Sequence, residues 1–104
     1  MQTDLIIASE YCQEFHVESS FIELLADEGL IELQIVEGVS YILTDQIPDL
    51  NRYVRWHYDL SINIEGIDTI RHLLLKMDEM QLEISRLRQQ LALLGTPDSR
   101  IENW

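Results

Sequence analysis

Few residues of this chain have the types and spacing that chemistry requires. Cys12 and His16 are four residues apart, the spacing at which two side chains on one helix face could bind a metal ion. The other histidines, His57 and His72, lie on two further predicted elements, and two ligands do not make a metal site. We therefore predict that Cys12 is a buried apolar side chain, as lone cysteines usually are.

Carboxylate pairs are frequent but predict no catalysis. Asp27-Glu28 and Asp78-Glu79 are sequence neighbours, so on a helix their side chains point in different directions and are expected to be solvated. The sequence has no glycine-rich phosphate loop and no G-x-S-x-G, H-E-x-x-H or C-x-x-C motif. We therefore predict a binding protein that is not an enzyme and needs no cofactor or metal.

The acidic residues are unevenly distributed. The 104 residues contain 19 Asp and Glu against 7 Lys and Arg, a formal net charge of -12, and residues 1–51 contain 11 of the acids and no Lys or Arg. Proteins bind DNA largely by neutralising phosphates with Lys and Arg, so this half should prefer a basic protein partner. A simpler interpretation stays open, in which the acids only keep the protein soluble.

Length and composition limit the class of protein. A chain of 104 residues with 46% hydrophobic residues can bury the core of one ordinary domain. Its uncharged runs, such as residues 5–9 and 38–44, are far shorter than the roughly 20 apolar residues of a membrane-spanning helix. The N-terminus has neither the basic start nor the apolar stretch of a secretory signal. We expect a cytoplasmic protein without membrane contact.

Two short helices are expected first, in a helix-turn-helix arrangement. The first should run from a cap at Ser9 to about Phe15. The second should begin at the capping box formed by Ser20 and Glu23 and end at Gly29. Its predicted apolar face consists of Phe21, Leu24 and Leu25.

A hairpin and a third helix should follow. The β-type runs 30–36 and 41–43 flank Glu37-Gly38, which predicts a wing that turns near Gly38. The third helix should start at residues 44–45, tolerate Pro48 in its first turn and end near residues 60–61. Its predicted buried face consists of Ile47, Leu50, Val54 and Tyr58.

The last helix has the most regular pattern. Asn63 is its expected cap, and from Ile70 to Leu94 apolar residues occupy every a and d position of four heptads. Such a helix is roughly 37 Å long at 1.5 Å per residue, too long for the preceding residues to cover. We therefore predict a coiled-coil seam that forms a homodimer, with an ordinary core helix as the alternative. The seam residues are Ile70, Leu73, Met77, Met80, Ile84, Leu87, Leu91 and Leu94.

The predicted fold is therefore mainly α. It comprises a winged helix-turn-helix with a third helix over residues 1–62, a long C-terminal coiled-coil helix over 63–95, and a tail over 96–104 that follows the stop signal Gly95-Thr96-Pro97.

The order of these elements, together with several short segments between about Ile7 and Leu91, carries a resemblance to a known family. The segments are Glu10-Tyr11-Cys12, residues 24–32, residues 52–60 and Gly66-Ile67. The chain resembles the MerR-like winged-helix superfamily and, within it, the chaperone-modulator (CbpM) family. DNA-binding members have an Arg where this chain has Glu23 and another about where it has Tyr41, so two phosphate contacts are missing.

The resemblance implies a function. Proteins of the chaperone-modulator family bind the J-domain of a DnaJ-like co-chaperone, the curved-DNA-binding protein, and inhibit it. A J-domain engages Hsp70 through a basic helix, so an acidic competitor is physically reasonable. The acids that we expect to contribute, on the second helix and the wing, are Glu23, Asp27, Glu28, Glu32 and Glu37.

Two other hypotheses stay open. The chain could be a MerR-like DNA-binding transcriptional regulator, in which Arg52, Arg55 and Arg71 would supply the phosphate contacts. It could also be an adaptor whose seam pairs with a different coiled-coil protein. The charge distribution favours the protein partner over nucleic acid. The direction in which two final helices would pair is left open by the sequence, although related MerR-like proteins imply an antiparallel arrangement.

Overall fold

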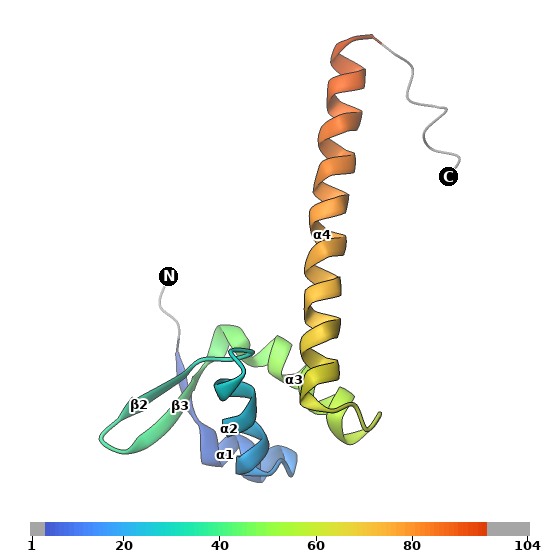
Figure 1. Ribbon diagram of the computed structural model, residues 1–104. Helices are drawn as coiled ribbons and strands as arrows, with labels where there is room; N and C mark the ends of the chain where they lie inside the picture. Colours follow the sequence, from blue (N-terminus) through green and yellow to red (C-terminus); the bar gives the residue numbers. More distant parts are fainter. Residues whose placement is uncertain (1–3, 96–104) are drawn as a thin grey trace. The chain divides into compact units, whose positions relative to one another are not determined.

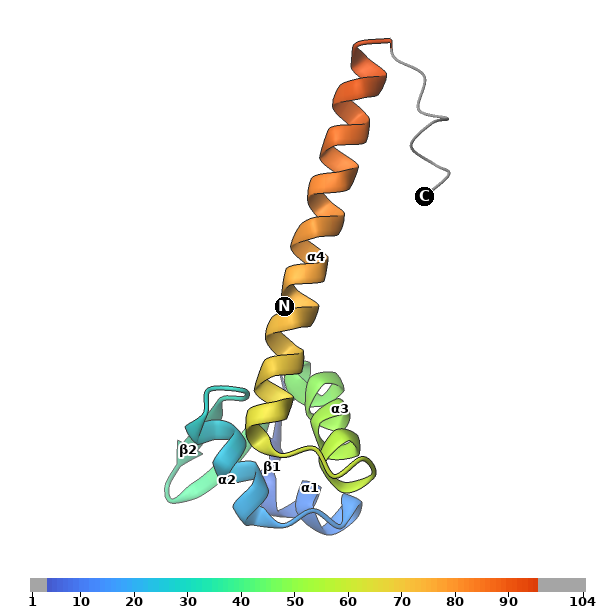
Figure 2. The ribbon, with the colours of Figure 1, turned by 45° about the vertical axis from the view of Figure 1, so that its right-hand side comes forward.

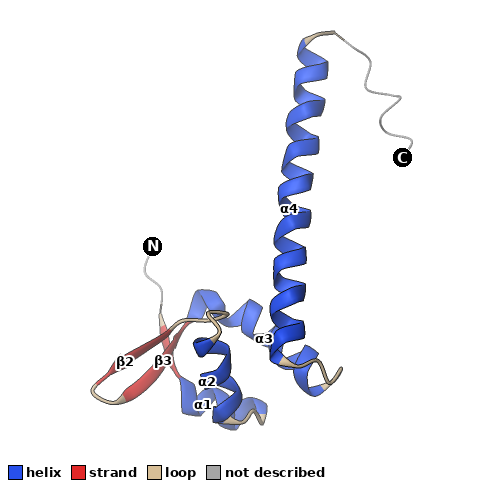
Figure 3. Ribbon diagram, viewed as in Figure 1, coloured by secondary structure: helices blue, strands red, loops and turns tan. Residues whose placement is uncertain are grey.

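The computed structural model describes residues 4–95 and confirms the predicted class, a mainly α winged helix-turn-helix with a small β-hairpin wing and a long C-terminal helix (Figures 1 and 3). The chain divides into two compact units at Thr69-Ile70. The elements are β1 (Leu5–Ile7), α1 (Ala8–Phe15), α2 (Ser19–Asp27), β2 (Leu33–Val36), β3 (Val39–Leu43), a 3-10 turn (Thr44–Gln46), α3 (Ile47–Tyr58) and α4 (Ile64–Leu93).

The sheet of the first unit has three antiparallel strands in the order β1-β3-β2. Leu5 pairs with Leu43 and Ile7 with Tyr41, which ties the start of the chain to the hairpin. The sequence prediction assigned no element to the apolar cluster at residues 5–7. Three apolar residues in a row have no period, so only their partner strand identifies them as a strand.

The hairpin of β2 and β3 is the predicted wing, and Figure 2 shows it projecting from the helices of the first unit. Its turn consists of Glu37 at φ 52° and Gly38 at φ 80°. Two consecutive residues with positive φ are the mark of a type I′ turn, the tightest connection that suits the twist of two antiparallel strands. The prediction of a turn near Gly38 is confirmed.

The predicted caps of the first two helices were each wrong by two residues. α1 begins at Ala8 with Ile7 as its cap, so Ser9 is inside the helix. α2 begins at Ser19, and its cap Glu18 makes no side-chain capping bond. The capping box is therefore absent, because Ser20 is already the second helical residue and its hydroxyl donates only a long 3.5 Å bond to the Glu18 carboxylate.

The end of α2 follows the prediction. Gly29 has φ 76°, its N–H donates to the Ala26 carbonyl at 3.0 Å, and the Leu30 N–H donates to the Leu25 carbonyl at 2.9 Å. These two bonds define a Schellman motif, which satisfies the last carbonyl groups of the helix and turns the chain toward the wing.

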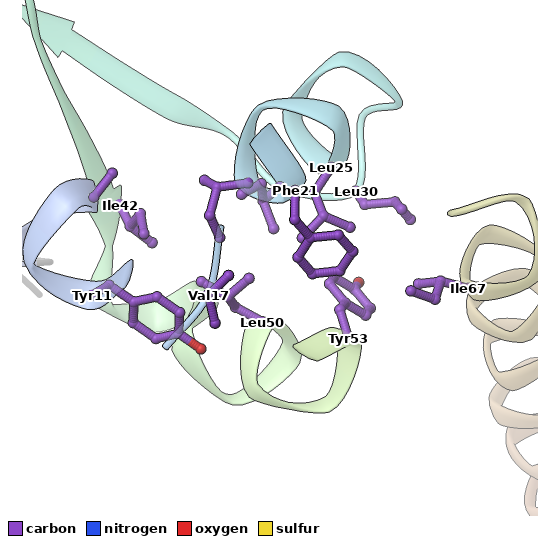
Figure 4. Packing of buried hydrophobic residues seen from close by; sticks show 12 residues of the cluster. Tyr11, Val17, Phe21, Leu25, Leu30, Ile42, Leu50, Tyr53 and Ile67 are labelled. Atoms are coloured by element: carbon purple, nitrogen blue, oxygen red, sulfur yellow. The ribbon is translucent and has the colours of Figure 1, made fainter. Parts of the chain in front are cut away.

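The core of the first unit takes its buried side chains from α1, α2, β3, α3 and the start of α4, together with the connecting segments (Figure 4). α2 buries Ile22 beside Phe21 and Leu25, whereas Leu24 is 49% exposed, so its predicted burial was wrong. α3 buries Leu50 and Tyr53, and the predicted Tyr58 lies at the edge of the core with 40% exposure. The buried residues are Ala8, Tyr11, Val17, Phe21, Ile22, Leu25, Leu30, Ile31, Ile42, Leu50, Tyr53 and Ile67.

Tyr58 at this edge still has a structural use. Its hydroxyl accepts a 3.0 Å hydrogen bond from the Glu18 N–H, and its ring meets Phe21 edge-on at 5.6 Å. The His57 ring also stacks on Phe21, with centroids 4.3 Å apart, and its Nδ1 lies 2.9 Å from the Ile62 carbonyl oxygen. A carbonyl oxygen only accepts, so Nδ1 carries the hydrogen. These contacts join the start of α2 to the end of α3.

The first turns of α4 belong to the first unit, and the cap of this helix is the predicted residue. The Gly66 N–H donates to Asn63 Oδ1 at 2.8 Å, which confirms Asn63 as the cap. A Cβ at Gly66 would lie only 2.7 Å from Ile62 Cγ2, so glycine is needed for this close approach. One residue later, Ile67 is fully buried in the core.

The second unit continues α4 to Leu93, where Gly95 at φ 76° follows the helix end. Most seam side chains are exposed in the single chain, including Leu73 at 60% and Met77 at 54%. Thr96 and Pro97 of the predicted stop lie outside the described residues. No described helix is long and apolar enough to cross a membrane.

Candidate partner-binding surface

The five acids singled out by the sequence lie on α2 and the wing, and each is exposed. Glu23 and Asp27 are one turn apart on α2, and Glu28 follows as its C-cap. Glu32 precedes β2, and Glu37 is in the turn of the wing. All five carboxylates can therefore meet a partner without a change in the core.

Two adjoining hollows lie between α2 and the wing, and we call them together the α2–wing groove. The first has a volume of about 330 Å³ and is bounded by α1, α2 and the wing. The second, about 730 Å³ and more open, is bounded by α2, the segment that follows it and the wing. They share three lining residues, which are Glu23, Leu33 and Ser40.

The groove brings together three of the five predicted acids. Glu23, Asp27 and Glu32 line the second hollow, and Glu23 also borders the first. Glu28 and Glu37 line neither hollow. The structure therefore separates the predicted set into three groove carboxylates and two that lie outside it.

No described residue that lines either hollow is Lys, Arg or His. Arg52 is paired with Asp49 within α3, and on α4 Lys76 pairs with Glu79 and Arg86 with Glu83. The Arg86 guanidinium, by its hydrogen bond, holds the pKa of the Glu83 carboxyl below its usual value. The groove carboxylates are thus open to cations from another molecule.

A side-chain amide fixes the start of β2, where Glu32 lies. The Glu32 N–H donates to Gln46 Oε1 at 2.7 Å, and Gln46 Nε2 donates to the Glu32 carbonyl at 2.8 Å. The two bonds imitate a pair of strand hydrogen bonds and connect the wing to the turn before α3. They hold Glu32 in a defined position relative to α3.

Cys12 lines the first hollow and is half-buried, not fully buried as predicted. Burial raises the pKa of its thiol above the usual value, so it is mainly a neutral thiol near pH 7. His16 is exposed at φ 55° beyond the end of α1. Among the described residues no group of three or more His, Cys, Asp and Glu could hold a metal ion.

The neighbouring Tyr11 is buried and anchors α1 to α3. Its hydroxyl donates to Asn51 Oδ1 at 2.7 Å. Burial, and to a smaller extent the nearby Cys12, raises the pKa of Tyr11 to about 12. Tyr11 therefore stays neutral and supports the wall that carries Cys12.

The groove itself could not be found in the sequence. Its walls come from β1, α1, α2, β2 and β3, and its non-acidic lining residues, such as Leu33 and Ser40, belong to no motif. A serine between two apolar residues of a strand is ordinary alternation. The one available signal was the acidic spacing of Glu23 and Asp27, four residues apart on α2.

The winged helix-turn-helix, followed by the long α4, defines a protein of the MerR type, and the chain belongs to this family. The profile of the family described as "MerR HTH family regulatory protein" matches residues 6–89.

Within this family the chain is similar to chaperone modulators. It is 27% identical over 81 residues to the "Chaperone modulatory protein CbpM" of Pseudomonas entomophila (strain L48), and 26% identical over 81 residues to the protein of the same name of Pseudomonas putida (strain W619). Each alignment covers 77% of this chain and 80% of the relative. No solved structure matches the chain significantly.

These comparisons confirm the expected resemblance to the chaperone-modulator family with a MerR-like relationship. The names of the two relatives point to a chaperone-modulating role and to a chaperone partner in general. The chaperone modulators and the MerR family are both families of regulators, not of enzymes.

Proposed function

We propose that the protein is a non-enzymatic chaperone modulator that binds the J-domain of a DnaJ-like co-chaperone and inhibits its activity. The α2–wing groove carries this proposal, because Glu23, Asp27 and Glu32 line it and no described lining residue is a cation. A basic partner surface would find uncompensated carboxylates there, and complementary charge speeds encounter and disfavours wrong partners. The relatives named as chaperone modulators support the choice of a co-chaperone as the partner.

The two acids outside the groove have a smaller part in this proposal. Both residues are exposed, Glu28 directly after Asp27 and Glu37 in the turn of the wing, and they add to the negative potential of α2 and the wing. At physiological salt a charge acts over roughly 8 Å, so their effect should be mainly on the association rate.

We also propose that the protein is a cytoplasmic homodimer through the seam on α4. The long exposed row of apolar side chains supports this, since a large exposed apolar stripe on a helix usually marks an interface. In the adaptor alternative, a coiled-coil helix of a different protein would pair with the same seam residues.

The functional test is an assay of the ATPase activity of an Hsp70 stimulated by its co-chaperone. An equimolar amount of this protein should abolish most of the stimulation. The triple variant Glu23→Gln, Asp27→Asn, Glu32→Gln should inhibit little, whereas a matched variant that neutralises the exposed Glu14, Asp59 and Glu65 should inhibit like the natural protein. Full stimulation in the presence of excess natural protein would contradict the proposal.

The family match alone supports a second candidate, a DNA-binding regulator. Its phosphate contacts would come from Arg52, Arg55 and Arg71, of which Arg52 is paired with Asp49. A gel shift at low salt with the upstream region of the gene distinguishes the two candidates. A specific shift that is lost in Arg55→Ala and Arg71→Ala would favour this second candidate.

A further inference from the structure

The two hollows of the α2–wing groove differ in chemistry. The first has a mainly apolar surface around the half-buried Cys12, with three serines and Glu23 among its lining residues. The second contains the carboxylates of Glu23, Asp27 and Glu32. The apolar residues that line the first hollow are Ile7, Ala8, Ile22, Leu33 and Val39. An apolar hollow therefore adjoins an acidic one, with Glu23 at the boundary.

Apolar side chains also remain exposed along the groove. Val39, at the wing side of the first hollow, is 39% exposed, and Ile35, which lines the second, is 70% exposed. A partner that covers exposed apolar surface lowers the free energy of the complex. A partner that contributed only charges would leave this surface in water.

The volume of the first hollow limits what it can hold. About 330 Å³ is at the lower end of the roughly 300 to 1,000 Å³ of small-molecule sites, and this hollow is partly open to solvent. It is large enough to take up an aliphatic side chain of a partner. Because carboxylates lie next to this hollow, the partner residue beside the inserted side chain should be a cation.

We propose that the α2–wing groove receives one basic amphipathic segment of the partner, which inserts an aliphatic side chain into the hollow beside Cys12 and presents Lys or Arg to Glu23, Asp27 and Glu32. The inference rests on the proposed function, since the J-domain would be the protein that carries this segment. It adds that the contact has an apolar anchor and is more than an attraction of opposite charges.

Cys12 is the single cysteine of the chain and serves as the reporter. The intact protein is treated with iodoacetamide at mildly alkaline pH, because burial raises the pKa of the Cys12 thiol. Two synthetic helical peptides of lysine and alanine are compared, one with a central leucine and one with alanine there. The bound leucine peptide should slow the alkylation of Cys12 about tenfold relative to the free protein. It should also bind about tenfold more tightly than the alanine peptide, since the two differ by the burial of one aliphatic side chain.

A pair of neighbouring serines provides a matched control in the protein. Ser19 lines the first hollow, and Ser20 lines neither hollow, while both are exposed. Ser19→Phe should fill the hollow, so that the leucine and alanine peptides bind alike. Ser20→Phe adds the same ring outside the groove and should keep the tenfold preference. The peptide comparison with the natural protein needs no variant, so it stands even where a variant folds poorly.

Three results would overturn the inference. One is equal protection of Cys12 by the leucine and alanine peptides. Another is an equal loss, in Ser19→Phe and Ser20→Phe, of the preference for the leucine peptide over the alanine peptide. The third is protection that rises with the protein's own concentration in the absence of peptide, which would assign the groove to a second copy of the chain.

The J-domain itself separates this inference from the proposed function. A J-domain that binds without protecting Cys12 would contradict the groove as the site and leave the proposed partner intact. Leucine-specific protection by the peptide, together with no binding of the J-domain, would support the groove chemistry and contradict the proposed partner.

Discussion

Gln46 holds both backbone polar groups of Glu32, accepting from its N–H at 2.7 Å and donating to its carbonyl at 2.8 Å. Glu32 is one of the three groove carboxylates, so a residue of the turn before α3 controls the position of a groove wall. The contact joins residues 14 positions apart in the sequence.

Gln46→Ala should loosen this wall. We expect a loss of about 1 to 2 kcal/mol in the free energy of unfolding, because two hydrogen bonds that contribute about 1 kcal/mol each are removed. Hydrogen exchange of the Glu32 amide should become faster. Gln13→Ala is the control, because Gln13 is exposed on α1. An unchanged exchange rate at Glu32 in Gln46→Ala would show that the amide does not hold the wing.

Glu37→Asn should stabilise the wing. Glu37 has φ 52°, a conformation that asparagine adopts more easily than glutamate and that the first position of a type I′ turn requires. We expect a gain of about 0.5 to 1 kcal/mol in urea unfolding. Glu37→Gln removes the same charge but keeps a residue that disfavours positive φ, so it should not gain stability. Equal gains in the two variants would attribute the effect to charge.

Tyr11 should make the protein sensitive to strong alkali. Its pKa is raised by burial from 10.0 to about 12, so the folded state favours the neutral phenol. The resulting stability is fully present below pH 10 and is lost as pH rises through about 12. Phenolate absorbance of the natural protein minus that of Tyr11→Phe should rise near pH 12. A difference that rises near pH 10 would contradict the burial of this hydroxyl.

The seam should determine the mass of the protein in solution. Leu87 is a seam residue with 45% exposure, whereas Leu82 lies outside the seam with 72% exposure. Light scattering of the natural protein should give twice the mass of one chain, and Leu87→Lys should give a monomer because a charge would be buried in the contact. Leu82→Lys is the matched control and should stay dimeric. A natural protein that is monomeric would contradict self-association.

The sequence predicted those features of the fold that depend on local chemistry. Gly38 and Gly29 require positive φ, so the wing turn and the end of α2 were predicted correctly. The cap of α2 was predicted two residues too late, at Ser20 instead of Glu18, because serine is a preferred cap residue and the cap used here makes no side-chain bond that the sequence could indicate.

Features that depend on distant residues could not be predicted. The strand β1 exists only through its pairing with β3, some 35 residues later in the chain. Leu24 and Ile22 are equally apolar, and the packing of the other helices decides that Ile22 is buried. The sequence predicted the acids of the candidate surface, but the groove between α2 and the wing is a product of the folded unit.

The most direct test of the proposed function is calorimetric titration of the full chain with the J-domain of a DnaJ-like co-chaperone. At low salt we predict binding that weakens as salt rises, because exposed charge pairs are screened. Glu23→Lys should bind about tenfold more weakly, since the reversal replaces an attraction by a repulsion, and Glu14→Lys, the same reversal on α1, should change the affinity less than about twofold. No heat of binding at low salt, or equal losses in the two variants, would contradict the account.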